Sequence, residues 1–164
     1  MDSSNDTTVK NSKIKDYGQL LKPNLSFLVV FSSVIAYLLV PGVHFELSKV
    51  IILFAGGMLV TGAANAINQI LEKDSDRLMK RTMFRPLPDA RMQRAEAWLF
   101  ALLTAFAGAA LLALSFNLLT GILSLVSLLL YAFAYTPLKK ISPIAVLVGA
   151  IPGAMPPLLG WVAA

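Results

Sequence analysis

Residues 50–71 read VIILFAGGMLVTGAANAINQIL and run directly into residues 72–85, EKDSDRLMKRTMFR. The first stretch is long and apolar enough for a membrane helix, which needs about 17–25 such residues. The second stretch is dense in acids and bases. The pair therefore predicts a membrane-spanning helix with a concentrated group of charges at one end, and that end is where we look for a site.

Four further apolar blocks indicate that this helix is one of several spans. Of the 164 residues, 57% are hydrophobic and only 14% are charged, whereas soluble domains carry about 25% charge. This composition predicts an all-α, multispan membrane bundle rather than a soluble helical protein. The five expected transmembrane helices cover residues 25–40, 50–71, 95–116, 118–135 and 143–164.

The basic residues predict how the bundle lies in the membrane. They gather before the first span, between the second and third, and between the fourth and fifth, and Lys49 is the one exception. All three segments would then lie on one side, which the positive-inside tendency identifies as the cytoplasm. The amino terminus would be cytoplasmic. The net charge of +5 then reflects topology and anionic lipid headgroups rather than nucleic-acid binding.

Outside the spans, the chain divides into a tail and one long loop. Residues 1–22 are expected to form a disordered cytoplasmic tail, and residues 23–164 a transmembrane domain. The tail resembles neither a cleavable signal nor an arginine-rich presequence, which favours the bacterial plasma membrane. The absence of cysteine excludes disulfides and thiolate chemistry. Residues 72–94 form the long loop, where functional residues are expected to concentrate.

Four oxygen-bearing side chains precede and enter this loop at spacings of three, four and four, so that they share one helix face. They are Asn65, Asn68, Glu72 and Asp76. The two carboxylates lie roughly 6 Å apart along the helix axis. Oxygen ligands without histidine or cysteine suit Mg²⁺, which retains waters and takes substrate phosphate oxygens. We therefore predict that Asn68, Glu72 and Asp76 hold Mg²⁺ on a phosphorylated substrate.

A group of cations follows the acids within the same loop: Arg77, Lys80, Arg81 and Arg85. Guanidinium groups present planar forks that match phosphate oxygens. Metal and cations together would clamp a diphosphate and stabilise the charge that develops as it departs. Three other basic residues of the loop are interpreted as solvated surface charges: Lys73, Arg91 and Arg94.

Two residues at the cytoplasmic end of the fourth span, Tyr135 and Lys139, are less distinctive. Tyrosine and lysine are common at membrane interfaces, so their spacing alone favours an anchoring role. His44, the only histidine, is interpreted as a surface residue on the opposite side of the membrane.

Several separated motifs resemble the UbiA superfamily of membrane prenyltransferases, whose first signature is an Asn-x-x-x-Asp-x-x-x-Asp run. That run corresponds to Asn68, Glu72 and Asp76, with glutamate where aspartate is commoner. The other similar stretches are residues 65–68 (NAIN), 74–76 (DSD), 79–82 (MKRT), 85–88 (RPLP), 135–139 (YTPLK) and the glycine- and proline-rich region 149–161. Phe84 departs from the pattern, because the family usually has asparagine at that position.

Within the family, the chain most resembles the enzymes that farnesylate heme. The resemblance implies transfer of farnesyl from farnesyl diphosphate to a vinyl group of heme b, with Mg²⁺ assisting the departure of diphosphate. It implies that Asn68, Glu72 and Asp76 bind the metal–diphosphate. It also implies that Arg81, Arg85 and Lys139 neutralise the diphosphate, with Tyr135 lining the same cavity. This resemblance thus favours a functional role for Tyr135 and Lys139.

The resemblance covers the first half of a fold of about nine helices, and the chain ends within an apolar segment at Ala164. We therefore expect a truncated enzyme that is inactive or very weak alone, and a carboxyl-terminal half or another membrane subunit as a possible partner. Three alternatives stay open: a prenyltransferase of the same family acting on another aromatic substrate, a cation carrier, and a non-catalytic membrane fragment.

Overall fold

In the computed structural model, which describes residues 12–164, the apolar stretch quoted above lies in one long helix, α3 (Leu47–Arg77). At about 1.5 Å per residue, α3 is roughly 46 Å long, whereas the hydrocarbon core of a bilayer is about 30 Å thick. One end of α3 must therefore project beyond the lipid. The projecting end carries the predicted acidic residues.

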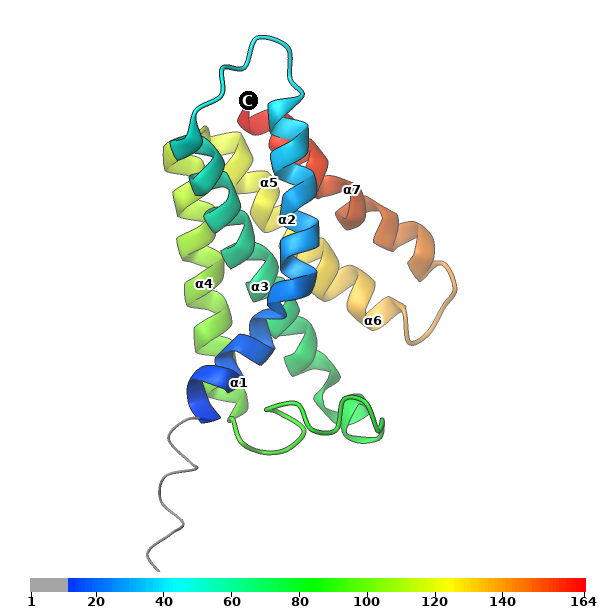
Figure 1. Ribbon diagram of the computed structural model, residues 1–164. Helices are drawn as coiled ribbons and strands as arrows, with labels where there is room; N and C mark the ends of the chain where they lie inside the picture. The colour runs from blue at the N-terminus through cyan, green and yellow to red at the C-terminus, as the bar shows by residue number, and fades with distance from the viewer. Residues whose placement is uncertain (1–11) are drawn as a thin grey trace, which may run out of the picture.

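The helices form one bundle in which α3 lies between α2 and α4 (Figure 1). Helices α2 and α4 pack against α3, while α5 packs on α4 and α7 runs obliquely across α2. The fourth span is one continuous helix of three parts, in which a π-helical turn, η1, separates α5 from α6. The bounds are α2 (Pro23–Leu38), α4 (Arg94–Ser115), α5 (Leu118–Leu129), η1 (Leu130–Tyr135), α6 (Thr136–Leu138) and α7 (Ala145–Ala163).

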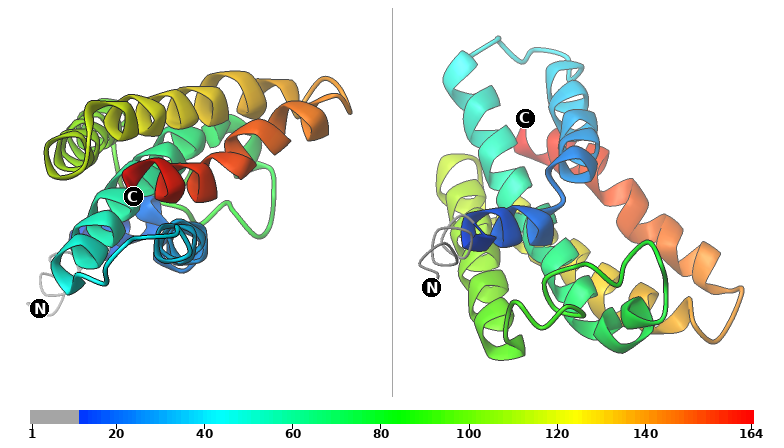
Figure 2. Two further views of the ribbon diagram at one scale, coloured as in Figure 1. Left: turned by 90° about the horizontal axis from the view of Figure 1, so that it is seen from above. Right: turned by 60° about the horizontal axis from the view of Figure 1, so that its bottom comes forward.

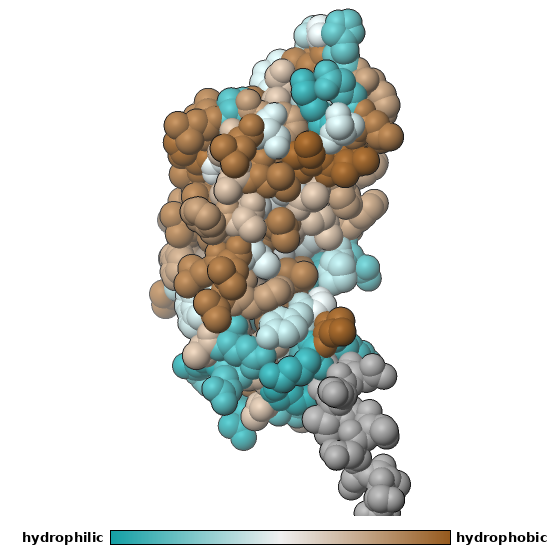
Figure 3. Space-filling view, turned by 90° about the vertical axis from the view of Figure 1, so that its left-hand side faces the viewer, coloured by the Kyte–Doolittle hydropathy of each residue, from teal (hydrophilic) through white to brown (hydrophobic). Residues whose placement is uncertain are grey.

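The helix lengths confirm the predicted class of a multispan membrane protein. Within residues 12–164, four helices are long and apolar enough to cross a membrane: α3, α4, the continuous helix Leu118–Leu138, and α7. Helix α2 makes a fifth when it is counted together with the short helix before it. A broad apolar band covers the side of the bundle, and hydrophilic side chains gather below it (Figure 3).

The expectation of a disordered tail over residues 1–22 is wrong for the part that the structure describes, because Ser12–Leu21 form helix α1. Asp16 and Leu20, one turn apart, are both fully buried, so α1 uses one face to pack on the bundle. The chain then bends by 41° into α2. At this bend Lys22 adopts a left-handed φ of 47°. Residues 1–11 lie outside the described residues.

One end of the bundle collects nearly all of the charged elements, and we call it the charged end. It consists of α1, the last turns of α3 from Asn68 onward, the loop 78–93, and α6 with Lys139 and Lys140 (Figure 2). The loop is shorter than the predicted range 72–94, because α3 continues to Arg77 and α4 already begins at Arg94.

Candidate functional site

The centre of the site is a group of side chains that joins the end of α3 to α6. The Asn68 Nδ2 donates to Glu72 Oε2 at 2.8 Å, and Lys139 Nζ lies 2.8 Å from Glu72 Oε1. Lys139 also donates to Asn68 Oδ1 at 3.3 Å, and the buried Thr136 hydroxyl donates to the same oxygen at 2.9 Å. The helical spacing that predicted a shared face for Asn68 and Glu72 is confirmed here.

The third predicted acid, Asp76, is one turn farther along α3 and has a different cation. Its Oδ2 lies 2.5 Å from Arg85 Nη1, with the Asp76 side chain only 6% exposed. Thr82 Oγ1 donates to the Asp76 carbonyl oxygen at 2.9 Å. These contacts draw the loop back onto α3. Two acid–cation pairs thus stand in sequence along one helix face, Glu72 with Lys139 and Asp76 with Arg85.

Two tyrosines of the π-helical turn η1 stack on each other, and one of them lies next to Lys139. The rings of Tyr131 and Tyr135 stack with centroids 5.6 Å apart, and Lys139 Nζ lies 5.3 Å from the centre of the Tyr135 ring. Gly149 of α7 gives the Tyr135 ring its space, because a Cβ there would lie 2.7 Å from the ring. Single π-helical turns of this kind are frequent at functional sites.

Lys22 belongs to the same charged group, although we did not predict it as a site residue. It stands at the bend between α1 and α2, at the charged end. Its amine interacts electrostatically with the Arg85 and Lys139 cations and with the Glu72 and Asp76 carboxylates. The signals in the sequence were its place directly before a span and the proline that follows it.

The other predicted site residues fall into two groups. Asn65 is buried and its Nδ2 donates to Ser26 Oγ of α2 at 3.1 Å. The remaining three are exposed, and within residues 12–164 no hydrogen bond or ion pair joins them to the central group: Arg77, Lys80 and Arg81. Lys140 Nζ, next to Lys139, donates to Ser75 Oγ at the surface. His44 is exposed, as predicted.

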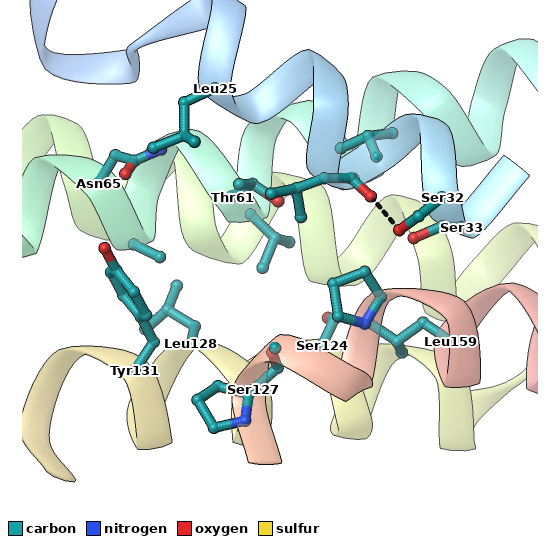
Figure 4. A pocket seen from close by; sticks show the side chains of 18 of the residues that line it. Leu25, Ser32, Ser33, Thr61, Asn65, Ser124, Ser127, Leu128, Tyr131 and Leu159 are labelled. Atoms are coloured by element: carbon teal, nitrogen blue, oxygen red, sulfur yellow. Dashed lines mark hydrogen bonds between the residues drawn. The ribbon is translucent and has the colours of Figure 1, made fainter. Parts of the chain in front are cut away.

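A cavity of about 720 Å³ begins beside this group and continues between α2, α3, α5 and α7. Asn65 and Tyr131 stand at one end and Ser33 and Leu159 at the other, with Ser124 and Ser127 between them (Figure 4). Most of the wall is aliphatic, and among its hydroxyls Ser32 and Ser124 donate to backbone carbonyls. The cavity suits a long apolar chain whose polar head would lie beside Tyr135, next to Lys139.

The oxygen donors at the mouth fit Mg²⁺ better than a softer metal. Asn68, Glu72 and Asp76 offer amide and carboxylate oxygens only. Across the described residues, no group of three or more His, Cys, Asp and Glu side chains gathers at one point. Mg²⁺ is held in proteins by such oxygen ligands together with waters and substrate phosphate oxygens.

Comparisons with known proteins point to one family of membrane prenyltransferases. A model of the UbiA prenyltransferase family matches residues 29–164. A protoheme IX farnesyltransferase of Cytophaga hutchinsonii is 44% identical over 152 residues, which cover 93% of this chain and 53% of that protein. The mitochondrial protoheme IX farnesyltransferase of Arabidopsis thaliana is 45% identical over 149 residues, covering 90% of this chain and 35% of that one.

A solved structure has the same fold. It is described as giving insights into the biosynthesis of digeranylgeranylglyceryl phosphate synthase in membranes, and it matches 93% of this chain and 54% of its own with a TM-score of 0.83. At 24% identity, this likeness concerns the fold alone. The chain spans about half the length of the curated relatives it matches first.

Proposed function

The chain belongs to the UbiA prenyltransferase family, and we propose that it forms the prenyl-diphosphate-binding half of a protoheme IX farnesyltransferase, or heme O synthase. Such an enzyme transfers farnesyl from farnesyl diphosphate to a vinyl group of heme b. The observation that carries the proposal is the pair of Glu72 and Lys139 beside Tyr135, a residue that lines the long apolar cavity. A second acid–cation pair, Asp76 with Arg85, follows one turn farther along α3. Relatives of 41–45% identity with this name support it.

The cations at the mouth would bind and neutralise the diphosphate. Lys139 and Arg85 now contact Glu72 and Asp76, so the charges of these poorly solvated groups are compensated before the substrate arrives. Lys22 lies close enough to interact electrostatically with both cations and both carboxylates. When the diphosphate enters, the cations can turn from the carboxylates to the phosphate oxygens and stabilise the charge of the leaving group.

Three side chains of α3 would hold Mg²⁺: Asn68, Glu72 and Asp76. The ion would add positive charge where the C–O bond to diphosphate breaks. The Thr136 hydroxyl and Lys139 orient Asn68 through its Oδ1. The allylic carbon of farnesyl would then lie beside Tyr131 and Tyr135, which line the apolar cavity next to the charged group. The heme vinyl group would capture it as diphosphate leaves, and addition of water with loss of a proton would quench the cation left on the vinyl carbon.

The exposed cations Arg77, Lys80 and Arg81 would extend the positive field around the mouth, and we retain Arg81 as a diphosphate ligand that approaches when substrate binds. The charged end would face the cytoplasm of a bacterial plasma membrane, in keeping with its basic residues. Because the relatives are about twice as long, we propose that transfer to heme needs a carboxyl-terminal half or another membrane subunit, and that this chain alone is inactive or very weak.

Binding of farnesyl diphosphate to the chain in lipid nanodiscs, measured by titration calorimetry with and without Mg²⁺, tests the proposal. Lys139→Met removes one charge-assisted contact, worth about 1.5–3 kcal/mol, so affinity should fall roughly ten- to hundredfold. Lys140→Met is the matched control, because the Lys140 amine donates to Ser75 at the surface and not, among the described residues, to the central group. Equal affinity in both variants, or binding indifferent to Mg²⁺ and to Glu72→Gln, would contradict the proposed site.

The acceptor is tested in the chain combined with a carboxyl-terminal half from a relative. Offered heme b and 4-hydroxybenzoate, the assembly should farnesylate only heme b. If only 4-hydroxybenzoate were farnesylated, the chain would instead belong to another aromatic prenyltransferase of the family. Turnover of heme b by the isolated 164-residue chain would contradict the need for a second half.

A further inference from the structure

Arg91 of the loop 78–93 has partners that its sequence context did not indicate. Arg91 is exposed, as expected, but it is more than a solvated charge, because the guanidinium joins α1 to two points of the loop. Its Nη1 contacts Asp16 Oδ1, its Nε donates to Asp89 Oδ2 at 2.8 Å, and its Nη2 donates to the Phe84 carbonyl oxygen at 2.7 Å. All three nitrogens of the planar fork are thus in use.

The carboxylate that meets this fork belongs to a helix that is itself firmly held. Asp16 is only 1% exposed. Helix α1 is attached to α3 by Gln69, whose Nε2 donates to the Leu20 carbonyl oxygen at 2.9 Å. It is attached to α4 by the Tyr17 hydroxyl, which donates to Glu96 Oε1 at 2.7 Å. Asp16 is therefore part of the rigid frame, and the loop is fastened to that frame.

The fastening point lies next to a residue of the site. Phe84 precedes Arg85, whose Nη1 is 2.5 Å from Asp76 Oδ2. Because residues 78–93 form turns and bends rather than a regular helix, the position of Arg85 depends on such tertiary contacts. Neither Asp16 nor Arg91 is among the described residues that line the cavity, so any effect on a ligand must pass through the loop.

We propose that Asp16 and Arg91 are positioning residues that hold Arg85 in place at the diphosphate site by fastening the loop to α1. The role rests on the proposed function. This role of Arg91 requires a guanidinium group and not only a positive charge, because one side chain must reach Asp16, Asp89 and the Phe84 carbonyl at once. The amine of a lysine is a single point charge and cannot do so.

Hydrogen–deuterium exchange of the full chain in nanodiscs tests the fastening. Arg91→Lys and Arg91→Gln should both accelerate exchange of the amides from Thr82 to Met92, while the peptides of α3, α4 and α5 keep their protection. Lys13→Gln is the control, since it removes an exposed α1–α4 ion pair and should leave the loop unchanged. Unchanged loop exchange in both Arg91 variants would overturn the inference.

Farnesyl diphosphate binding provides the second measurement. Each Arg91 variant and Asp16→Asn should bind farnesyl diphosphate about tenfold more weakly, the loss expected for one charge-assisted contact. Each should bind farnesol, which has no phosphate, as the wild type does. Faster loop exchange with unchanged diphosphate affinity would overturn the positioning role alone. A wild-type chain that binds farnesol but not farnesyl diphosphate would instead overturn the proposed function.

Discussion

Replacement of Gly160 by alanine should separate α7 from α2. An ideal Cβ at residue 160 would lie 1.9 Å from the Ser33 carbonyl oxygen and 3.0 Å from the Tyr37 backbone nitrogen. Both are backbone atoms, so no side chain can turn aside. A carbon–oxygen contact needs about 3.3 Å, which means that the two helices must move apart by roughly 1.4 Å.

The energetic cost follows from that displacement. Overpacking costs about 1–3 kcal/mol, and a backbone clash belongs at the upper end. The better helix propensity of alanine returns up to about 1 kcal/mol. We therefore expect Gly160→Ala to lower the free energy of unfolding by about 2 kcal/mol. Because α2 and α7 form opposite walls of the cavity, farnesyl diphosphate affinity should fall as well.

The measurement is unfolding by sodium dodecyl sulfate in mixed micelles, followed by tryptophan fluorescence. Gly153→Ala is the matched control on the same helix, because a Cβ at residue 153 would meet nothing within 4 Å. That variant should be as stable as the wild type or gain up to about 1 kcal/mol. If the two variants unfolded at the same detergent fraction, the close approach of α2 and α7 would be refuted.

Three further substitutions probe the charged end. Lys22→Met should weaken farnesyl diphosphate binding about tenfold, because it removes a cation that lies near Arg85 and Lys139; equal calorimetric affinities of variant and wild type would contradict this. Ala90→Gly should raise the unfolding free energy by about 1 kcal/mol, because Ala90 has a left-handed φ of 58° that glycine adopts without strain, and a loss of stability would contradict it. Thr136→Val should lower the free energy of unfolding by about 1–3 kcal/mol, because it removes the donor to buried Asn68. No change in fluorescence-detected unfolding would contradict this.

The predicted helix face was correct because its register is local. Asn68, Glu72 and Asp76 are one turn apart on α3, and the period of an α-helix brings them to one side whatever packs around them. The continuous apolar run before them likewise required a membrane helix, since backbone groups in lipid must be satisfied within the segment. The residues that contact this face from other helices could not be predicted in the same way. The spacing of Tyr135 and Lys139 favoured an anchoring role, and only the family resemblance implied a place in the site.

The incorrect and the missing predictions concern contacts between distant segments. Residues 12–22 are polar enough for a free tail, yet α1 is ordered because it buries Leu20 and Asp16 against the bundle. Arg91 has the composition of a surface charge, and its partner Asp16 is 75 residues away. No periodicity within the loop could indicate either contact.

By itself, the sequence determined the membrane helices, the side on which charge collects, and the order of acids along α3, because each follows from hydropathy or from the period of one helix. Only the tertiary structure decided which cation meets which acid, that Lys22 joins them, and that Arg91 fastens the loop. The physical reason is that ion pairing depends on distance in space, which is set by the packing of helices whose contacting residues lie far apart along the chain.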